Sequence, residues 1–361
     1  MKQNDNKIVL SICIPTYNRK TLLKEILDEI LRYPYNDIEI IVIDNASTDG
    51  TKELLDSYHD LRLRVKFNEQ NIGMTNNQVL AAFSGNGKYT LVLIDRDKLD
   101  SRKLVYITKR LHQLDMPIIL LDYKATEEVS IYGGKALSAA VIRTHPSFLI
   151  YHTQKLHNCV KINDLYKMIL SDKQLPYAYT GVIGVHLLAE CSKISVLPNS
   201  DAITLEIKKV PSYAQYGIKH KTIYYEPEAS LKRYTKYMDI LKQRYSANEY
   251  KKYVPYVYTA EFSRGVLSHY QNSHGRYMAR KYKIKKKSIT EYNRFYIYYL
   301  KQAIDLMIRD NKFSIKNFFI INIASWCLLF KIYCAEKPFK KCEKLIKISN
   351  KFLDIWLYPI A

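Results

Sequence analysis

The sequence predicts an α/β protein with a mostly parallel sheet in its N-terminal part and a mainly helical, basic C-terminal part. Two observations carry this prediction. Strand-like apolar runs alternate with helix-like patterns up to about residue 125, which favours a parallel sheet with right-handed crossovers. From about Tyr213 onward, tyrosine and lysine dominate and bring most of the positive charge.

Five segments have the β-branched and apolar composition of buried strands. They are Ile8–Ile14, Ile38–Ile43, Leu61–Phe67, Tyr89–Ile94 and Pro117–Leu121. Helices are expected between them, because apolar residues recur there at helical spacing. The expected helices contain Leu22–Leu31, Leu54 and Leu55, Thr75–Phe83, and Ser101–Leu114.

The length of 361 residues and the hydrophobic content of 47% are sufficient for two domains with apolar cores. Residues 1–200 contain 25 Lys and Arg against 22 Asp and Glu, whereas residues 201–361 contain 31 against 13. The net charge of +21 therefore belongs mostly to the C-terminal part. We expect a binding and catalytic domain over residues 1–212. A helical domain rich in Tyr and Lys should follow over residues 213–361 and contact an acceptor, a membrane surface or a partner.

Cysteine usage favours a reducing compartment. The six cysteines show no Cys-x-x-Cys pairing, so we expect buried thiols rather than a disulfide framework or a zinc site. Met1–Lys7 leads into the first predicted strand without a signal-peptide pattern, which also favours the cytoplasm. No Gly-x-Gly-x-x-Gly or Walker signature occurs, which argues against a dehydrogenase or a nucleoside triphosphatase.

Polar residues follow each of the first four predicted strands. The segments are Pro15–Arg19, Asp44–Gly50, Asn68–Gly73 and Asp95–Asp97. In a parallel sheet these ends lie on one edge, which is where ligands bind in such folds. Four polar ends on one edge predict a binding site, whereas a single polar loop would not.

Asp95 and Asp97 form an Asp-x-Asp pair where a buried strand is expected to end. Two carboxylates in that place suit a Mg²⁺ or Mn²⁺ ion that bridges a diphosphate. Such an ion acts as a Lewis acid while the diphosphate leaves. A solvated turn is the alternative for an Asp-x-Asp pair taken alone.

The other strand ends offer groups that suit a nucleoside. Asp44 can accept hydrogen bonds from a pyrimidine imide or a ribose hydroxyl, or it can cap a turn. Thr16 and Tyr17 can bracket a base by hydrogen bonding and stacking. Gly73 can adopt a positive φ and let a ligand approach the backbone. Together these groups predict a nucleotide-diphosphate site without a glycine-rich phosphate loop.

In order and spacing, these motifs resemble those of family 2 glycosyltransferases of GT-A fold, of the bacterial surface or capsular polysaccharide type. The matching segments are Ser11–Arg19, Asp44–Thr51, Asn71–Gly73 and Gly87–Tyr89 with Asp95–Asp97. The resemblance covers about residues 7–125. It implies a Rossmann-like GT-A domain, a nucleotide-diphosphate sugar donor with a UDP-sugar expected, a Mn²⁺ or Mg²⁺ ion, and inversion at the anomeric carbon.

The resemblance also implies roles for single residues. Thr16, Tyr17 and Asp44 would contact the nucleoside. Asp97 would bind the metal, and Asp95 would contact the ribose or sugar side or serve as a second metal ligand. The remaining candidates for donor binding are Pro15, Arg19, Asn45, Asn71, Gly73, Asn76 and Arg96.

Three departures from the family pattern affect this interpretation. Lys98 stands where many members have a further acidic residue, and Asn76 and Asn77 stand where many have an Arg. Arg96 is unusual at the middle position, where it either reaches a phosphate or lies in solvent. Metal affinity or donor preference would differ accordingly.

Inversion requires a base that deprotonates the acceptor hydroxyl. Many family members supply it from a Glu-Asp pair near the start of a helix, but the corresponding stretch, Pro176–Gly181, has no acid. The base candidates are therefore Asp172, Glu190 and His145. The alternative for each is a surface carboxylate or a histidine bonded within a loop.

Long helices are expected in the C-terminal part, over Ser230–Tyr245, Glu291–Arg309 and Lys340–Leu357. The mostly apolar run Phe318–Phe330 has 13 residues, which is too short to span a bilayer, and lysines flank it. Aromatic residues in a basic segment indicate contact with a membrane surface, and a core helix is the alternative. A lipid-linked oligosaccharide acceptor at the inner membrane surface would account for the charge and the aromatics.

We therefore expect a metal-dependent, inverting glycosyltransferase that is peripheral at the cytoplasmic face of the membrane. It would transfer a sugar to a hydroxyl of a lipid-linked glycan in bacterial surface polysaccharide synthesis. The alternatives are a transferase with a soluble or protein acceptor, and a non-catalytic basic binding protein on the same scaffold. Nucleic acid is not expected as a partner, because no helix-turn-helix, zinc-finger or RNA-recognition signature occurs. Association into a homo-oligomer is left open.

Overall fold

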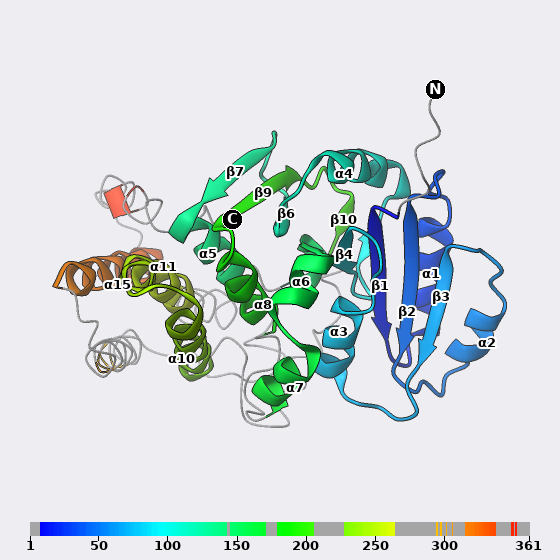
Figure 1. The fold of residues 1–361 in the computed structure, drawn as a ribbon, viewed down its shortest axis with the longest axis horizontal. Coiled ribbons are helices and arrows are strands. Elements are labelled where there is room, and N and C mark those ends of the chain that lie inside the picture. The colour runs from blue at the N-terminus through cyan, green and yellow to red at the C-terminus, as the bar shows by residue number, and fades with distance from the viewer. Residues whose placement is uncertain are drawn as a thin grey trace. The chain divides into compact units, whose positions relative to one another are not determined.

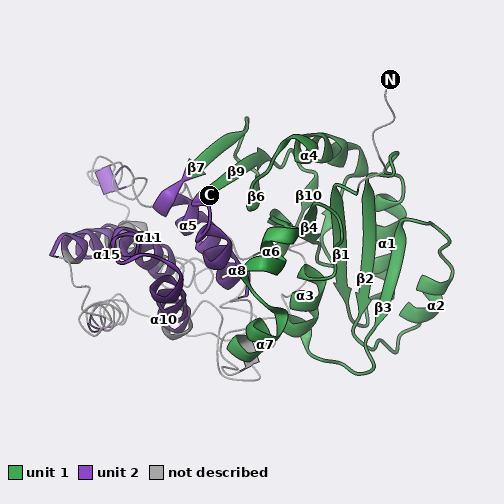
Figure 2. Cartoon of the chain, in the orientation of Figure 1, with its two compact units in different colours: residues 1–131, 143–172, 193–209 green, residues 132–142, 173–192, 210–361 purple. Residues whose placement is uncertain are grey.

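The computed structural model describes residues 8–142, 145–170, 179–205, 227–263 and 315–336, and seven single residues. These single residues are 294, 297, 301, 305, 348, 349 and 351. Figure 1 shows strands and helices alternating along the first part of the chain and long helices in the later part. The chain divides into two compact units (Figure 2). Unit 1 comprises residues 1–131, 143–172 and 193–209, and unit 2 comprises residues 132–142, 173–192 and 210–361.

Unit 1 contains the strands and most of the short helices. Its strands are β1 (Leu10–Thr16), β2 (Ile38–Asp44), β3 (Leu63–Phe67), β4 (Tyr89–Val92), β5 (Lys98–Leu99), β6 (Ile118–Asp122), β7 (Val129–Tyr132, whose last residue belongs to unit 2), β8 (Leu149–His152), β9 (Lys193–Pro198) and β10 (Ile203–Thr204). Its helices are α1 (Lys20–Ile30), α2 (Thr51–Asp56), α3 (Met74–Ala82), α4 (Ser101–Gln113), the 3₁₀ turn η1 (Pro146–Phe148), α6 (Thr153–Cys159) and α7 (Ile162–Leu170).

Eight strands form one sheet in the order β3-β2-β1-β4-β8-β6-β9-β7, and β10 pairs with β5 in a second, two-stranded sheet. The pairs β1–β2, β1–β4, β2–β3 and β6–β9 are parallel, whereas β8 is antiparallel to both β4 and β6. The predicted α/β architecture with a mostly parallel sheet is therefore confirmed. The antiparallel β8 was not expected from the sequence.

The central strands lie in a continuous apolar core. Every residue of β1, β2 and β4 is buried, as is typical of parallel strands that are covered on both faces. α1 buries Leu23, Leu27 and Ile30 in the same cluster. Each such side chain contributes about 1.5–3 kcal/mol when it is fully buried.

A polar cluster secures the edge of the sheet where the central strands begin. Buried Glu39 accepts hydrogen bonds from Ser11 Oγ (2.6 Å), Arg64 Nη2 (2.5 Å) and the backbone N–H of Asn86 (2.7 Å). The N–H of Gly87 donates to Ser11 Oγ over 2.8 Å. These bonds hold the loop between α3 and β4 against β1 and β2.

Unit 2 is helical where it is described. Its helices are α5 (Gly133–Ile142), α8 (Tyr179–Leu188), α10 (Pro227–Arg244), α11 (Ala247–Ser263) and α15 (Ile315–Glu336). The prediction of a helical C-terminal part is confirmed, and α10 coincides with the helix expected over Ser230–Tyr245. The helices expected over 291–309 and 340–357 lie almost entirely outside the described residues, as does the domain boundary predicted between residues 212 and 213.

Tyrosines and close helix contacts form the core of unit 2. Tyr237 and Tyr250 are fully buried, and Tyr245 Oη donates a hydrogen bond to the carbonyl of Val185 over 3.0 Å, joining α10 to α8. A Cβ at Gly184 would lie 2.8 Å from the Cβ of Ala140. Small residues at this contact therefore let α8 approach α5.

A buried ion pair joins α10 to α11. Arg233 Nε lies 3.1 Å from Glu261 Oε2, and both side chains are 0% exposed. Removing one partner of such a pair is strongly destabilising, because the other charge would stay buried without compensation.

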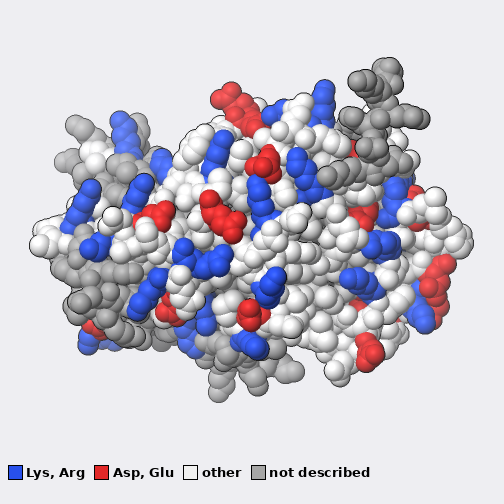
Figure 3. Space-filling model, in the orientation of Figure 1, with Lys and Arg blue, Asp and Glu red and all other residues white. Residues whose placement is uncertain are grey.

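Charges are mixed over the face of the molecule shown in Figure 3. Lys and Arg side chains lie among Asp and Glu there and do not gather over one element. Among the helices that the structure describes, none combines the length and the hydrophobicity needed to cross a bilayer.

Candidate functional site

The ends of β1, β2 and β3 meet at one edge of the sheet, as predicted. Thr16 is paired in register with Asp44, and Asp44 with Phe67. The N–H of Asn45 donates to the carbonyl of Thr16 (3.0 Å), and the N–H of Asn68 donates to that of Asp44 (2.9 Å). The polar loops that follow these strands therefore begin side by side.

β4 ends at Val92, earlier than the predicted Ile94, and the chain turns over residues 95–97. The N–H of Leu93 still donates to the carbonyl of Cys13 over 2.9 Å. The chain thus stays beside β1 for one more residue before it reaches Asp95. This places the Asp95/Asp97 pair at the same edge as the other polar loops.

Asp95 is buried and paired with a cation. Its side chain is 3% exposed, and its Oδ1 lies 2.5 Å from Nη1 of Arg19. Burial raises the pKa of this carboxyl group, and the guanidinium of Arg19 opposes that shift. Arg19 comes from the turn between β1 and α1, so the first loop supplies the counter-ion of the first carboxylate.

Asp97 has a different environment. Its Oδ2 accepts a hydrogen bond from Ser147 Oγ over 2.6 Å, and Nε2 of His145 lies 3.6 Å from the same oxygen. Its Oδ1 is buried and has no hydrogen-bond partner among the described residues. Burial raises the pKa of Asp97 to about 7, although the bond from Ser147 and the charge of Arg96 oppose this shift.

His145 is the base candidate that the structure brings to this pair. Burial lowers the pKa of its imidazole to about 3, with a further contribution from Arg96. The imidazole is therefore neutral near pH 7. Its Nδ1 has no hydrogen-bond partner among the described residues.

For the other two base candidates the structure describes no contact with the pair. Glu190 belongs to unit 2, where its side chain is 59% exposed and lies 4.0 Å from Arg244. Asp172 lies outside the described residues. Within the described chain, His145 is thus the predicted base candidate that lies beside Asp97.

The nucleoside candidates line the end of β1 and β2. Asp44 is buried and accepts hydrogen bonds from the N–H and hydroxyl of Ser47, at 3.1 and 2.5 Å. The turn-capping alternative is therefore realised for Asp44. Thr16 is buried, Tyr17 is 43% exposed, and Pro15 is buried within β1 opposite Ile43.

Four asparagines, which we call the asparagine cluster, connect the second and third loops. They are Asn45, Asn68, Asn71 and Asn77. Nδ2 of Asn45 donates to Oδ1 of Asn71 (2.8 Å), while Nδ2 of Asn68 donates to Oδ1 of both Asn45 (3.0 Å) and Asn77 (2.9 Å). The N–H of Ile72 also donates to Oδ1 of Asn45 (3.0 Å). The cluster thereby fixes the turn before α3.

The turn itself has the predicted conformation. Gly73 has φ +86°, which favours glycine, and a Cβ there would meet nothing within 4 Å. Asn76 uses its Nδ2 to donate to the carbonyl of Ile72 over 2.8 Å. Asn76 is thus engaged within the first turn of α3.

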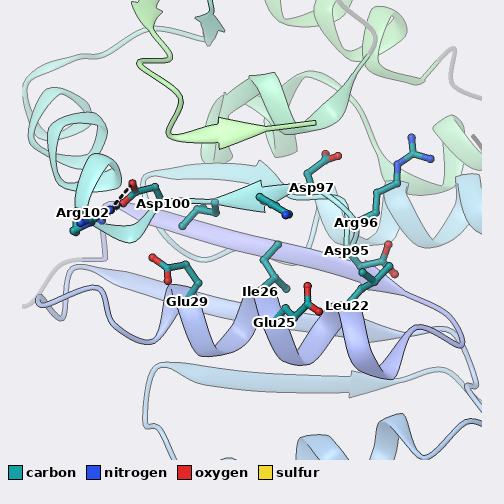
Figure 4. A pocket seen from close by; sticks show the side chains of 11 residues that line it. Leu22, Glu25, Ile26, Glu29, Asp95, Arg96, Asp97, Asp100 and Arg102 are labelled. Atoms are coloured by element: carbon teal, nitrogen blue, oxygen red, sulfur yellow. Dashed lines mark hydrogen bonds and ion pairs between the residues drawn. The ribbon is translucent and has the colours of Figure 1, made fainter. Parts of the chain in front are cut away.

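A groove of about 330 Å³ lies between α1 and the segment of residues 95–100. Its lining residues are Leu22, Glu25, Ile26, Glu29 and residues 95–100 with Arg102. Figure 4 shows Glu25 and Glu29 rising from α1 toward this segment, while the carboxylate of Asp97 lies on the segment's other side. The groove is therefore next to the pair, but the Asp97 oxygens do not point into it.

Some residues of the site were not identified from the sequence. Ser147 is one of them: it reaches Asp97 from fifty residues downstream, and no local spacing signals that contact. His145 was a base candidate, but its place beside Asp97 was not predicted. Asn68 lies in a predicted loop and Asn77 in the predicted helix Thr75–Phe83, and the sequence assigns neither of them a part in the hydrogen bond that joins them. In the described residues, no group of three or more His, Cys, Asp or Glu side chains is arranged to hold a metal.

The fold and this edge define an α/β protein with a buried carboxylate pair where a parallel strand ends. A sequence comparison is more specific. The family described as "Glycosyl transferase family 2" matches residues 11–114 of the chain.

Two curated relatives match the same part of the chain. Abequosyltransferase RfbV of Salmonella typhimurium strain LT2 is 36% identical over 124 residues, which are 33% of this chain and 37% of that protein. The putative teichuronic acid biosynthesis glycosyltransferase TuaG of Bacillus subtilis strain 168 is 30% identical over 100 residues, 27% of this chain and 40% of that protein. The matches thus span about two fifths of these relatives.

Solved structures agree with the fold over more of the chain. The crystal structure of S. aureus TarS 1–349 aligns with a TM-score of 0.55 at 16% identity, over 90% of this chain and 88% of that chain. The same protein in complex with UDP-GlcNAc aligns with a TM-score of 0.51 at 18% identity, over 90% and 89% of the two chains. This likeness confirms the predicted GT-A type of fold.

Proposed function

We propose that the chain is an inverting glycosyltransferase that transfers a sugar from a nucleotide-diphosphate donor to a hydroxyl group in bacterial surface polysaccharide synthesis. The observation that carries the proposal is the buried Asp95/Asp97 pair within a family 2 domain. One Asp97 oxygen is buried without a partner among the described residues. The names of the relatives RfbV and TuaG support the same class of reaction.

A divalent cation fits this pair. Mg²⁺ and Mn²⁺ prefer carboxylate oxygens and usually need only one or two of them beside substrate phosphates. Asp97 would hold the ion through Oδ1, and Asp95 would become a second ligand only if its ion pair with Arg19 rearranged. When bound, the cation would neutralise charge on the leaving diphosphate.

The remaining edge residues would bind the donor. Tyr17 is exposed enough to stack on a base, and Asp44 would share its carboxylate between Ser47 and the nucleoside. Arg96 would face a phosphate. Because TarS has been solved with UDP and with UDP-GlcNAc, a UDP-sugar is the first donor to test.

His145 is our candidate for the base. It lies beside Asp97, and its neutral imidazole can accept the proton of an acceptor hydroxyl. A pKa of about 3 makes it a weak base in the free protein. The negative charge of a bound diphosphate would raise that pKa, because a nearby opposite charge favours the imidazolium.

We propose a lipid-linked acceptor and a peripheral position at the cytoplasmic face of the membrane. On α15, Ile315, Phe319, Ile323 and Trp326 are 46–68% exposed and recur at helical spacing. Residues 201–361 contain 31 Lys and Arg against 13 Asp and Glu. An exposed apolar stripe in a basic region suits an anionic lipid surface.

Release of nucleoside diphosphate by the full-length chain tests the reaction. Candidate donors are UDP-, GDP-, CDP- and dTDP-sugars with and without Mn²⁺. A donor that binds should also raise the melting temperature, by an equivalent of about 2.7 kcal/mol at a hundredfold excess over its Kd. Lipid-linked and soluble acceptors, supplied separately, distinguish the two acceptor classes.

Asp97→Ala should reduce release by about 10²-fold or more, because the variant loses electrostatic stabilisation of the leaving group. The matched control is Asp115→Ala, whose carboxylate is 72% exposed and lies away from the Asp95/Asp97 pair, next to Lys155. If no donor stabilises the protein and none is turned over, the chain is a binding protein on this scaffold and the proposal is wrong.

A further inference from the structure

Ser147 occupies an unusual position for a serine. It lies in η1, is 0% exposed, and belongs to the turn that leads into β8. Its Oγ accepts a hydrogen bond from the N–H of Ile94 over 3.1 Å and donates one to Oδ2 of Asp97 over 2.6 Å. The hydroxyl group is therefore fixed between the end of β4 and the second carboxylate of the pair.

The two carboxylate oxygens of Asp97 have different surroundings. Oδ2 is held by Ser147, and His145 Nε2 is 3.6 Å away on the same side. Oδ1 is buried without a partner among the described residues. Holding one oxygen of a carboxylate restricts rotation of the group, so the direction of the other oxygen is fixed as well.

A buried polar atom without a partner is costly, and such atoms are few in native structures. Ser147 could satisfy only one carboxylate oxygen, because a hydroxyl has a single proton to donate. Oδ1 of Asp97 is thus a buried acceptor to which a ligand could bind. A cation accepts lone pairs from carboxylate oxygens and therefore suits this oxygen.

We infer that Ser147 is a positioning residue: it holds Asp97 through Oδ2 so that Oδ1 is presented to the cation of a metal–nucleotide complex. The inference rests on the proposed function, since that function supplies the cation. Ser147 does not touch the substrate. It acts through Asp97, in the way that hydrogen-bonded partners of metal ligands orient them.

Metal binding by the full-length chain, measured directly, tests this role. Free Mn²⁺ is titrated by electron paramagnetic resonance in the presence of UDP, for the wild type and for Ser147→Ala. We expect the Kd for Mn²⁺ to rise about tenfold in the variant, the lower end of the effect of losing a partner of a metal ligand. Ser147→Thr retains the hydroxyl group and should restore part of the affinity.

Ser138→Ala is the matched control. Ser138 is equally buried, at 0% exposed, but its Oγ has no partner among the described residues. The control should bind Mn²⁺ as the wild type does. If Ser147→Ala does not fold, as judged by circular dichroism, Ser147→Cys replaces it, because a thiol keeps the shape and is only a weak donor.

The outcomes separate this inference from the proposed function. Unchanged Mn²⁺ affinity in Ser147→Ala, or no Mn²⁺ binding by the wild type, overturns the role of Ser147, and neither result contradicts sugar transfer without metal. Weakened binding in the variant, with no turnover of any donor by the wild type, supports the role of Ser147 and contradicts the transferase proposal.

Discussion

Asp95 and Asp97 are two residues apart and are both buried, yet their partners give them different properties. Asp95 is neutralised by Arg19, whereas Asp97 has a serine and a neutral histidine beside it. The sequence predicted the pair because it follows an apolar strand. It could not predict Ser147 or the pairing with Arg19, because those contacts depend on how distant loops meet.

The pKa of Asp97, raised to about 7 by burial, leads to a stability prediction in metal-free buffer. Between pH 4 and 7 the folded state holds a proton that the unfolded state has lost, so the free energy of unfolding falls as pH rises through this window. Asp97→Asn carries no charge and should lack this fall. The free energy of unfolding of the variant, relative to that of the wild type, should therefore rise by about 2–4 kcal/mol between pH 4.5 and pH 8.

Urea denaturation with EDTA at several pH values measures this difference. Asp115→Asn is a control of opposite sign, since the hydrogen bond from Lys155 lowers the pKa of Asp115. Removal of that carboxylate should reduce stability slightly at neutral pH and not at acidic pH. Parallel pH profiles for wild type and Asp97→Asn would contradict the proposed environment of Asp97.

At the scale of elements, the asparagine cluster connects β2, β3 and the turn before α3. The sequence identified Asn45 and Asn71 because they belong to recognisable loops. The contacts of Asn68 and Asn77 could not be predicted, although both residues lie in segments named from the sequence, because these contacts form only when β2 and β3 pair in register. Asn77 also donates to the carbonyl of Ile43 over 3.0 Å, which ties α3 to β2.

Asn45→Ala should weaken both the fold and donor binding. The variant loses the acceptor for Asn68 and Ile72 and the donor to Asn71. Because Asn45 is buried and both Asn68 and Ile72 are half-buried, we expect a loss of about 1–3 kcal/mol in the free energy of unfolding. The KM for the donor should rise more than kcat falls, since the 71–73 turn is loosened while Asp97 is untouched.

The change Asn45→Asp keeps the acceptor for Asn68 and Ile72, but it loses the bond to Asn71 and buries a carboxylate. Its loss of stability should therefore grow as pH rises and the carboxyl group ionises, whereas that of Asn45→Ala should not. Asn36→Ala, at an exposed position, controls for loss of an asparagine. Chemical denaturation and donor kinetics of the three variants provide the comparison. Equal stability of Asn45→Ala and Asn36→Ala would show that the cluster does not hold the turn.

At the scale of the whole molecule, the fold class was predictable because alternating patterns and polar strand ends are local features. The antiparallel β8 was not, since its place between β4 and β6 is decided by distant pairing. The helices α5 and α8 also belong to unit 2, although both lie within the first 192 residues. Interleaving of this kind leaves no composition boundary in the sequence.

The distribution of charge yields the last prediction, which concerns the proposed membrane contact. Full-length protein should float with vesicles that contain anionic phosphatidylglycerol at about 50 mM salt, where the Debye length exceeds 10 Å. Binding should weaken at about 500 mM salt and be poor on neutral phosphatidylcholine, because the attraction is electrostatic. The variant Ile315→Ser/Phe319→Ser removes two exposed apolar side chains from α15 and should reduce flotation several-fold.

Leu61→Ser is the matched control, since Leu61 is fully exposed but lies in unit 1. Absence of flotation on anionic vesicles at low salt would contradict the membrane contact. Equal losses in the α15 and Leu61 variants would show that α15 does not provide it.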